Sequence, residues 1–364
     1  MLDRCRRRRV RAAIACVSAG AMTTACGGSA EGDAASVSAT PAAPAVTLGI
    51  STMSVPPTAT GTATIQRATA TSMVAPERVP LAVEQEVETG GGPGILAATD
   101  DALWIELHRA SHLARLDPES MTVELLPDVP AHCFISAAAG VVWTTIHREN
   151  LVTRTDAETG VTTLIEMPHA CGLEATDDEV WITDPDDGLV HRLDPNTGDV
   201  VQTIDVPEAP FTLSAVGDVL FATGEGDGGW LSVIDVATGA IEHNHTWPEI
   251  TRLDDMASGF GAVWATGRGD PRLFELDPAT GDVIATIDVG GKPSGIAAGE
   301  DALWITLLDG DLVRVDPIAG QITGAWTSEY TWLTSPVLAF GSLWMTSLDQ
   351  NVVIRVDPAT LEAT

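Results

Sequence analysis

The stretch KPSGIAAGEDALWITLLDGDLVRVDPIAGQITGAWTSE, residues 292–329, shows how this chain is built. It contains four short apolar segments, GIAA, ALWIT, LVRVD and QITGAW, which are separated by Gly, Asp and Pro. Each segment is long enough for a β-strand of about four to six residues and too short for a stable helix. The DPIAG string after the third segment has the composition of a hairpin turn. The stretch therefore predicts one four-stranded antiparallel unit.

This unit recurs seven times along the chain. A large aromatic residue recurs in the second segment at spacings of 39, 38, 40, 43, 40 and 40 residues, and an Asp follows in step with it. The aromatic positions are Trp104, Trp143, Trp181, Phe221, Trp264, Trp304 and Trp344, and the Asp positions are Asp117, Asp156, Asp194, Asp235, Asp277, Asp316 and Asp357. A period near 40 residues with four short strands per unit is the signature of a β-propeller. We predict an all-β fold, a seven-bladed β-propeller of four-stranded blades, with the aromatic rings between blades and the Asp residues in turns.

The last unit contains only three complete strands, and the missing outer strand is expected before blade one. RVPLAVEQEVETGGGPGILAATDDALWI, residues 78–105, aligns with TGDVIATIDVGGKPSGIAAGEDALWI, residues 280–305. The alignment makes residues 79–88 an outer strand. Because an unpaired sheet edge is a liability, we expect this strand to pair with the last blade and close the ring.

The first 77 residues differ in composition from the repeats. Residues 1–25 combine a basic RCRRRRVR segment with a short apolar core, which predicts a signal peptide. This part resembles a bacterial lipoprotein signal, with Cys26 as the acylated residue, and plain secretion is the alternative. Residues 26–77 are rich in Ala, Thr, Ser and Pro and predict a disordered tether before the propeller at 78–364. The protein is therefore expected to be exported and held by lipid on the extracytoplasmic face of the cell membrane.

The chain is strongly acidic, with 19 Lys and Arg against 51 Asp and Glu, a net charge of −32. Removing residues 1–25 takes away six Arg and one Asp and brings the net charge to −37. A surface of this sign repels phosphate backbones, so a nucleic-acid partner is not expected. We expect a soluble, monomeric propeller domain.

Two cysteines, Cys133 and Cys171, lie beyond the N-terminal segments. Each lies ten residues before the aromatic residue of its blade, so the two occupy equivalent places at the start of neighbouring innermost strands. In an exported protein such a pair favours a disulfide. Two alternatives remain open, a pair of thiols and a zinc site shared with His132 and His169.

Polar residues are concentrated in two sets of loops that share one face of the predicted ring, around the mouth of its central channel. These are the loops that lead into each innermost strand and the turns between second and third strands. Blades one to three bring histidines there, and blades four and five bring carboxylates. Convergent polar groups are the default hypothesis for a binding site. The candidates for catalysis are His108, His132, His147 and His169, and those for ligand binding are Arg148, Asp254, Asp255, Arg268, Tyr330 and Trp332.

The IDVGGKPSGIAAGEDALWIT string, residues 287–306, is similar to the YVTN-type propeller repeat, and the ALWIT…VRVDP cadence resembles streptogramin B (virginiamycin B) lyase-like propellers. The resemblance covers about residues 78–364. It implies a seven-bladed propeller. For the lyases it implies a His and a Glu near the channel mouth, with magnesium, that open a cyclic depsipeptide by elimination.

These observations predict an exported, lipid-anchored propeller that binds a small ligand or a protein at its channel mouth. One alternative is a lyase or hydrolase of a cyclic ester or depsipeptide, with one of the four histidines as base and a divalent ion, Mg²⁺ or Zn²⁺, as cofactor. The other is a structural module of the cell surface.

Overall fold

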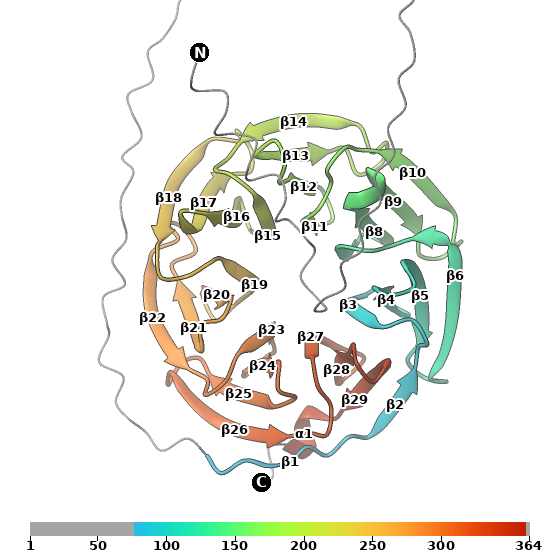
Figure 1. Ribbon diagram of the computed structural model, residues 1–364, viewed down its shortest axis with the longest axis vertical. Coiled ribbons are helices and arrows are strands. Elements are labelled where there is room, and N and C mark those ends of the chain that lie inside the picture. The colour runs from blue at the N-terminus through green and yellow to red at the C-terminus, as the bar shows by residue number, and fades with distance from the viewer. Residues whose placement is uncertain (1–75, 362–364) are drawn as a thin grey trace, which may run out of the picture. The chain divides into compact units, whose positions relative to one another are not determined.

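Seven antiparallel sheets surround a common axis in the computed structural model, which describes residues 76–361 (Figure 1). The strands of each blade run in sequence order from the innermost to the outermost. Blades one to three consist of β3 (Pro93–Ala98), β4 (Leu103–Leu107), β5 (His112–Asp117) and β6 (Thr122–Pro130); β7 (Ile135–Ala138), β8 (Val141–Ile146), β9 (Leu151–Asp156) and β10 (Thr162–Glu166); β11 (Leu173–Ala175), β12 (Val180–Asp184), β13 (Leu189–Leu193) and β14 (Val200–Asp205).

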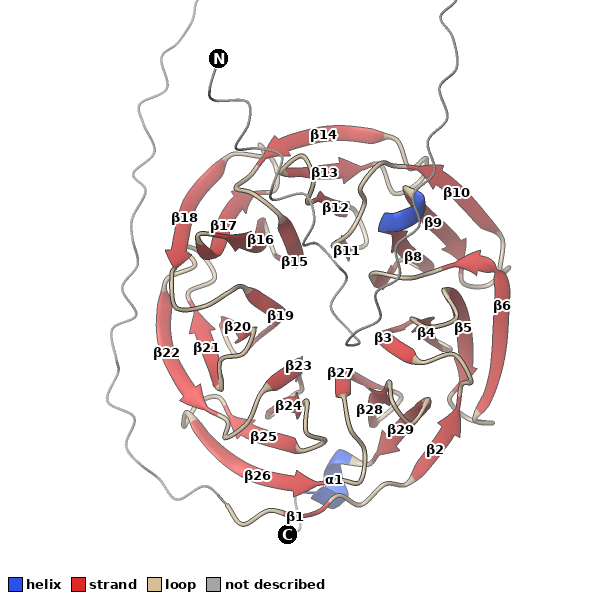
Figure 2. Ribbon diagram, viewed as in Figure 1, coloured by secondary structure: helices blue, strands red, loops and turns tan. Residues whose placement is uncertain are grey.

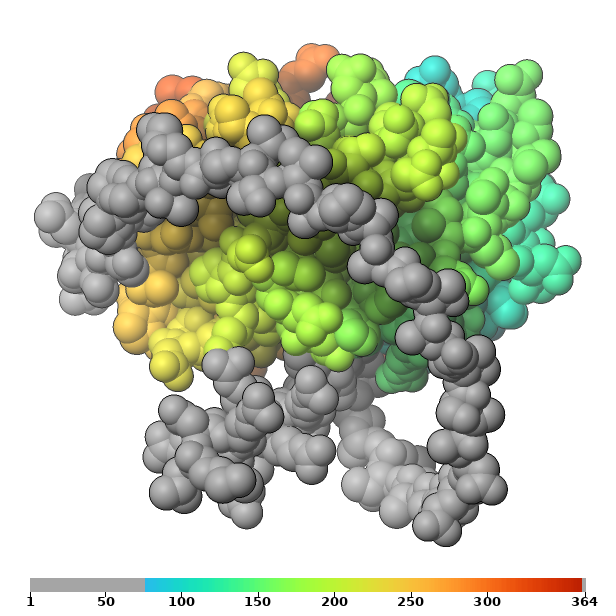
Figure 3. Space-filling model, turned by 90° about the horizontal axis from the view of Figure 1, so that it is seen from above, coloured from blue at the N-terminus to red at the C-terminus, as the bar shows by residue number. Residues whose placement is uncertain are grey.

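Blades four to six repeat the same order of strands. They consist of β15 (Pro210–Val216), β16 (Val219–Gly226), β17 (Gly228–Asp235) and β18 (Ile241–Trp247); β19 (Leu253–Gly259), β20 (Ala262–Gly267), β21 (Arg272–Leu276) and β22 (Val283–Asp288); β23 (Pro293–Ala298), β24 (Leu303–Leu307), β25 (Leu312–Asp316) and β26 (Gln321–Thr327). Figure 3 shows blades three and four, in green and yellow, side by side at the edge of the ring. The predicted fold class, a propeller of seven four-stranded blades, is confirmed.

The last blade is closed by the N-terminal side of the domain. Its strands are β27 (Leu333–Ala339), β28 (Ser342–Ser347), β29 (Val352–Val356) and, outermost, β2 (Gln85–Glu88). β2 pairs antiparallel with β29, with Val87 opposite Val353. In Figure 1 the blue β2 lies beside the red β29. The predicted closure is therefore confirmed, although the strand that pairs with β29, Gln85–Glu88, is shorter than the predicted 79–88.

A second strand of this segment makes a contact that the sequence did not predict. β1 (Val79–Pro80) pairs in parallel with β26 of blade six, and Val79 lies opposite Trp326. The segment 79–88 therefore ties blade six to blade seven as well as completing blade seven. Among residues 76–361, the two helical segments are η1 (His147–Glu149) and α1 (Pro358–Leu361), drawn in blue in Figure 2.

The aromatic residue of each second strand is buried between blades, as predicted. Trp104 is 1% exposed and packs in one cluster with Ile135 and Val142 of blade two and with Val129 of its own blade. Trp344 is fully buried and belongs to a cluster with β3 to β5 of blade one. Each ring therefore depends on the following blade for its burial, and the last blade depends on the first.

The repeated Asp residues organise turns, also as predicted. Asp277 Oδ1 accepts hydrogen bonds from the backbone N–H groups of Ala279 (2.8 Å) and Thr280 (2.9 Å). These bonds lower the pKa of the Asp277 carboxyl. The other six repeat Asp residues accept one or two backbone hydrogen bonds in the same way. These carboxylates are turn residues.

No helix within residues 76–361 is long and apolar enough to cross a membrane. The predicted signal peptide, the tether and Cys26 lie outside the described residues.

Removing β1 and β2 tests the closure. A chain that starts at residue 90 should melt at a lower temperature and aggregate, because blade seven would expose the edge of β29 and blade six would lose β1. A chain that starts at residue 76 is the matched control, since it keeps both strands. Thermal unfolding with light scattering measures the difference, and equal melting of the two chains would contradict the closure.

Candidate functional site

The loops between second and third strands and the loops leading into the innermost strands lie on one face of the ring, which we call the mouth face. Four histidines of blades one to three gather on it in two pairs. The rings of His108 and His132 are stacked with their centres 4.5 Å apart. The rings of His147 and His169 are 6.4 Å apart, and His147 Nδ1 lies 3.0 Å from the carbonyl oxygen of His169. The structure thus brings the four predicted histidines together in pairs.

Glu106 is a residue of this site that the sequence analysis did not include. It lies on β4, two residues after Trp104, and its side chain is 1% exposed. In the other six blades the equivalent residue is a fully buried threonine, namely Thr145, Thr183, Thr223, Thr266, Thr306 and Thr346. Several of these hydroxyls bond the backbone of a neighbouring blade, as Thr223 does with the Leu253 carbonyl (3.1 Å). Blade one therefore places a carboxylate in a position where the repeat requires a small hydroxyl.

Glu106, His108 and His132 form one polar group. One potential ligand atom from each lies within 4.8 Å of the other two, and His108 Nδ1 is 3.3 Å from Glu106 Oε1. Glu106 Oε1 and His132 Nε2 are buried and have no hydrogen-bond partner within residues 76–361. A buried polar atom without a partner costs free energy, so these two atoms point to a bound species.

Two neighbours prepare this group. Gly94 leaves room for the carboxylate, because a Cβ at this position would collide with Glu106 Oε2. His132 Nδ1 lies 3.1 Å from the carbonyl oxygen of His108, so this nitrogen carries the proton and donates it. Burial lowers the pKa of His132, and the neighbouring His108 lowers it further. A neutral His132 with its Nε2 lone pair available is the result.

The donor atoms limit which ion this group can hold. Mg²⁺ takes oxygen ligands in octahedral geometry, so two imidazoles and one carboxylate are a poor match for it. Zn²⁺ binds imidazole nitrogen and carboxylate oxygen, and two His with one Glu leave its fourth position open. An imidazole that donates its other nitrogen to a backbone carbonyl is the usual arrangement of a metal ligand. The group fits zinc better than magnesium.

A second polar group lies in blade three. His169 Nδ1 is 3.4 Å from Asp184 Oδ1 and 3.7 Å from Asp187 Oδ2. Asp184 Oδ1 already accepts hydrogen bonds from the backbone N–H groups of Asp186 (3.1 Å) and Asp187 (3.0 Å). The Asp187 side chain is 61% exposed. This group is therefore a turn with a histidine packed against it. Its carboxylates are more exposed or already hydrogen-bonded, so it suits a metal ion less well than Glu106, His108 and His132 do.

Blades four and five contribute a network of arginines and carboxylates. The buried Arg252 donates from Nε to Asp254 (2.6 Å) and from a terminal nitrogen to Glu225 (2.7 Å). Its guanidinium lies 3.6 Å from the ring centre of Phe211. Arg268 donates to the other oxygen of Asp254 (3.2 Å) and keeps its side chain 27% exposed. Asp254 and Arg268, both predicted site residues, are thus in contact, and the hydrogen bond from Arg252 holds Asp254 in place.

The remaining predicted ligand-binding residues are spread out. Arg148 is exposed on η1, near enough to contribute to the lowered pKa of His132. Tyr330 is buried and donates its hydroxyl to Glu86 of β2 (2.6 Å), so it supports the closure of the ring. Trp332 is half-buried, and its backbone N–H donates to the Leu308 carbonyl (3.0 Å). The structure does not bring these three residues together.

Asp255 lies on the innermost strand β19 and, with Glu174 of β11, links neighbouring blades. Asp255 Oδ2 accepts a hydrogen bond from the N–H of Ile296 in blade six (3.0 Å), and Glu174 Oε1 accepts one from Ala215 in blade four (3.2 Å). Burial raises the pKa of each of these two carboxyls to about 7.

Cys133 and Cys171 lie at the start of neighbouring innermost strands, Cys171 buried and Cys133 half-buried, and the disulfide between them stays a prediction. Thr145 lies between their backbones. Its carbonyl accepts from the Cys133 N–H (3.0 Å), and its hydroxyl donates to the Cys171 carbonyl. Thr145 of β8 thus bridges the backbones of the two cysteines by hydrogen bonds.

Comparisons with known proteins bear on the fold. No protein-family model and no curated protein matches the chain. A streptogramin B lyase structure is 19% identical over 74% of this chain and 96% of its own, with a TM-score of 0.65. A chain of the mitotic checkpoint complex is 13% identical over 79% and 98%, with a TM-score of 0.65. A chain of Kuenenia stuttgartiensis hydrazine synthase is 14% identical over 74% and 97%, with a TM-score of 0.63. The chain therefore has a streptogramin B lyase-like propeller fold.

The raised pKa of Glu174 predicts a dependence of stability on pH. The folded carboxyl holds its proton up to about pH 7, whereas the ordinary pKa is 4.5, so the free energy of unfolding should fall as pH rises between these values. The loss is about 3 kcal/mol. Glu174→Gln keeps the acceptor for Ala215 and removes the titration, so its melting temperature should fall less over this range. Thermal unfolding across the range measures this, and parallel curves for parent and variant would refute it.

Proposed function

We propose that this propeller binds a divalent metal ion on its mouth face through Glu106, His108 and His132, and through that ion a small ligand. Zinc is the ion that the donor set favours. The observation that carries the proposal is the buried Glu106 carboxylate, which replaces a threonine. Its Oε1 has no hydrogen bond within residues 76–361 and lies 3.3 Å from His108 Nδ1. A cation would compensate for the cost of burying this carboxylate.

Each residue of the proposed metal site has a separate role. Glu106 supplies negative charge, and Gly94 leaves the space that the carboxylate occupies. The His108 carbonyl orients His132, whose lowered pKa keeps its Nε2 lone pair unprotonated at neutral pH. The ion, when bound, would polarise a carbonyl or hydroxyl oxygen of the ligand at its open position. The residues proposed to contact ligand oxygens are the exposed Arg148 and the half-buried Arg268, whose side chain is 27% exposed.

A second candidate function is a metal-assisted lyase or hydrolase of a cyclic ester or depsipeptide. The fold similarity to a streptogramin B lyase and the open position of the proposed metal site favour it. In this reaction a neutral histidine takes a proton from the substrate. His147 suits that role, because its Nδ1 donates to the His169 carbonyl and leaves Nε2 as the acceptor.

The proposed place of action is outside the cytoplasm. The sequence of residues 1–25 supports export, and Cys26 is the proposed site of lipid attachment. The acidic composition agrees with a soluble domain that has no nucleic-acid partner and acts as a monomer.

Glu106→Thr tests the metal site with a residue that fits the position in six other blades. The parent should bind one zinc ion per chain after dialysis, and Glu106→Thr should lose at least about tenfold in zinc affinity, because a charged ligand is removed. Calorimetric titration and metal analysis measure this. Thermal unfolding of the zinc-free proteins checks that the variant folds.

His243→Ala is the matched control, since His243 is an exposed histidine on the outer strand β18, away from the mouth face. It should bind zinc as the parent does. Equal zinc affinity of Glu106→Thr and the parent would contradict the proposed site.

Streptogramin B supplied to the same proteins separates the two proposed functions, ligand binding and lyase activity. Turnover that is lost in Glu106→Thr and on chelation would favour the lyase, and its absence would leave binding alone.

Cys26→Ser tests the anchor. The parent chain expressed in a bacterium that processes lipoproteins should be found in the membrane fraction with a lipid-modified N-terminus at Cys26. The variant should be soluble or unprocessed. Intact-mass measurement of the exported parent decides the point, and an unmodified N-terminus at another residue would refute lipid attachment.

A further inference from the structure

Blade two contains an arginine that lacks the partner of its counterparts. In five blades an arginine of the third strand lies opposite the Trp of the second strand, with its guanidinium 5.3–6.0 Å from the indole centre. Four of these arginines also pair with a carboxylate: Arg115 with Asp101, Arg192 with Glu179, Arg314 with Asp301 and Arg355 with Glu84. The fifth, Arg154, forms no ion pair within residues 76–361. Its Nε donates to the Pro195 carbonyl (2.9 Å), and its terminal nitrogens remain for another acceptor.

The turn before β8 explains the difference. Asp101, Glu179 and Asp301 all come from the turn between the first and second strands of their blades. In blade two this turn consists of Ala139 and Gly140, which both have left-handed backbone, with φ of 49° and 72°. Neither residue carries a carboxylate, so this turn lacks the acid that pairs with the arginine in blades one, three and six.

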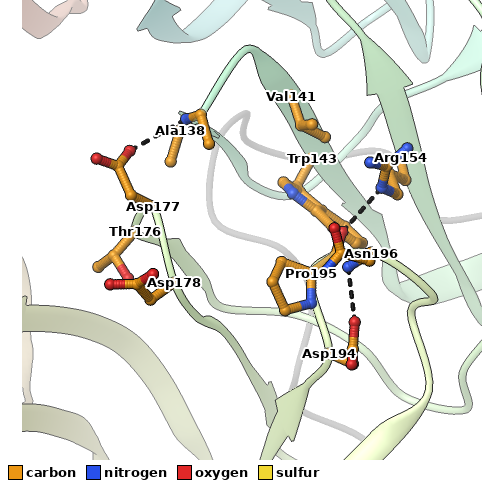
Figure 4. A pocket seen from close by; sticks show the side chains of 11 residues that line it. Ala138, Val141, Trp143, Arg154, Thr176, Asp177, Asp178, Asp194, Pro195 and Asn196 are labelled. Carbon is orange, nitrogen blue, oxygen red and sulfur yellow. Dashed lines mark hydrogen bonds between the residues drawn. The ribbon is translucent and has the colours of Figure 1, made fainter.

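A cleft of about 370 Å³ opens where that carboxylate would lie. Blade two lines it with the turn between its first and second strands and with Trp143 and Arg154. Blade three lines it with its turns between first and second strands and between third and fourth strands, which places the cleft on the face opposite the mouth face. Figure 4 shows Arg154 and Asn196 on one side of the cleft and Asp177 and Asp178 on the other. Asp177 accepts a hydrogen bond from the Ala139 N–H (3.2 Å), and Asp178 is exposed.

We propose that this cleft binds a free α-amino acid. The carboxylate of the amino acid takes the place at Arg154 that Asp101, Glu179 and Asp301 take in their own blades, and its ammonium group faces Asp177 and Asp178. Arg presents two parallel donors that match a carboxylate.

The charge and size of the cleft select this class of ligand. A simple anion is repelled by a chain of net charge −32, whereas a zwitterion brings a positive group for the opposite wall. A volume of 370 Å³ is at the lower end of small-molecule sites, which favours a ligand of this size. Val141 and Pro195 offer apolar contact for a side chain. The cleft is separate from the proposed metal site, so the two can be tested apart.

Val141→Glu is the decisive variant. Val141 lies two residues before Trp143, as Glu179 lies two residues before Trp181, so the new carboxylate should pair with Arg154 as Glu179 pairs with Arg192. The twenty amino acids are titrated singly into the full chain by calorimetry, with EDTA present so that metal chelation on the mouth face does not contribute. At least one should bind saturably, and Val141→Glu and Arg154→Gln should each weaken it about tenfold or more.

Arg192→Gln is the matched control and should bind as the parent does, because Glu179 already occupies its guanidinium. Acetate and methylammonium, each of which carries one of the two charges, should bind far more weakly than the amino acid. Thermal unfolding shows whether each variant is folded. The proposal fails if no amino acid binds the parent, if both Val141→Glu and Arg154→Gln bind as the parent does, or if acetate binds as tightly as the amino acid.

Discussion

The burial of one aromatic ring between each pair of blades is the contact on which the rest of this fold depends. Trp104 is shielded by blade two and Trp344 by blade one, so a single blade cannot bury its own ring. A large aromatic buries about 150–250 Å² of surface, mostly apolar, and this gain exists only when the neighbour is in place. A repeat of this kind is stable when the ring is closed. The pairing of β2 with β29 and of β1 with β26 therefore secures every other interface.

Sequence periodicity predicted the parts of the structure that recur, and it missed the parts that occur once. The aromatic and Asp positions predicted the blades, the core and the turns, because each makes the same local contact seven times. Tyr330 was expected at the mouth, yet it bonds Glu86 across the ring closure, a contact between residues 244 positions apart. The direction of a single loop side chain is set by such tertiary contacts, which a repeat pattern does not encode.

Glu106 shows what the same pattern could have revealed. The position two residues after the aromatic holds threonine in six blades, so the register alone marks Glu106 as an exception. The aromatic and Asp positions by themselves do not mark Glu106, because it belongs to neither series. In a repeat protein the residues shared by all blades form the fold. A residue that differs from them and destabilises the fold is therefore a candidate for a functional role. Glu106, a buried carboxylate whose Oε1 has no hydrogen bond within residues 76–361, is such a residue. Arg154, which lacks the acid that four equivalent arginines have, is another.

The Glu106 site carries negative charge and the Arg154 site positive charge, so the net negative charge of the chain affects the two sites in opposite ways. A field from 51 acidic against 19 basic residues concentrates cations near the surface, which assists an ion at Glu106, His108 and His132. The same field opposes an anion at Arg154, so a carboxylate is expected there only with a positive charge attached to it. Screening by salt weakens both effects over distances beyond about 8–10 Å. The selectivity of the two sites therefore has to come from their nearest groups: two imidazoles and a carboxylate at the first, and an arginine opposite two aspartates at the second.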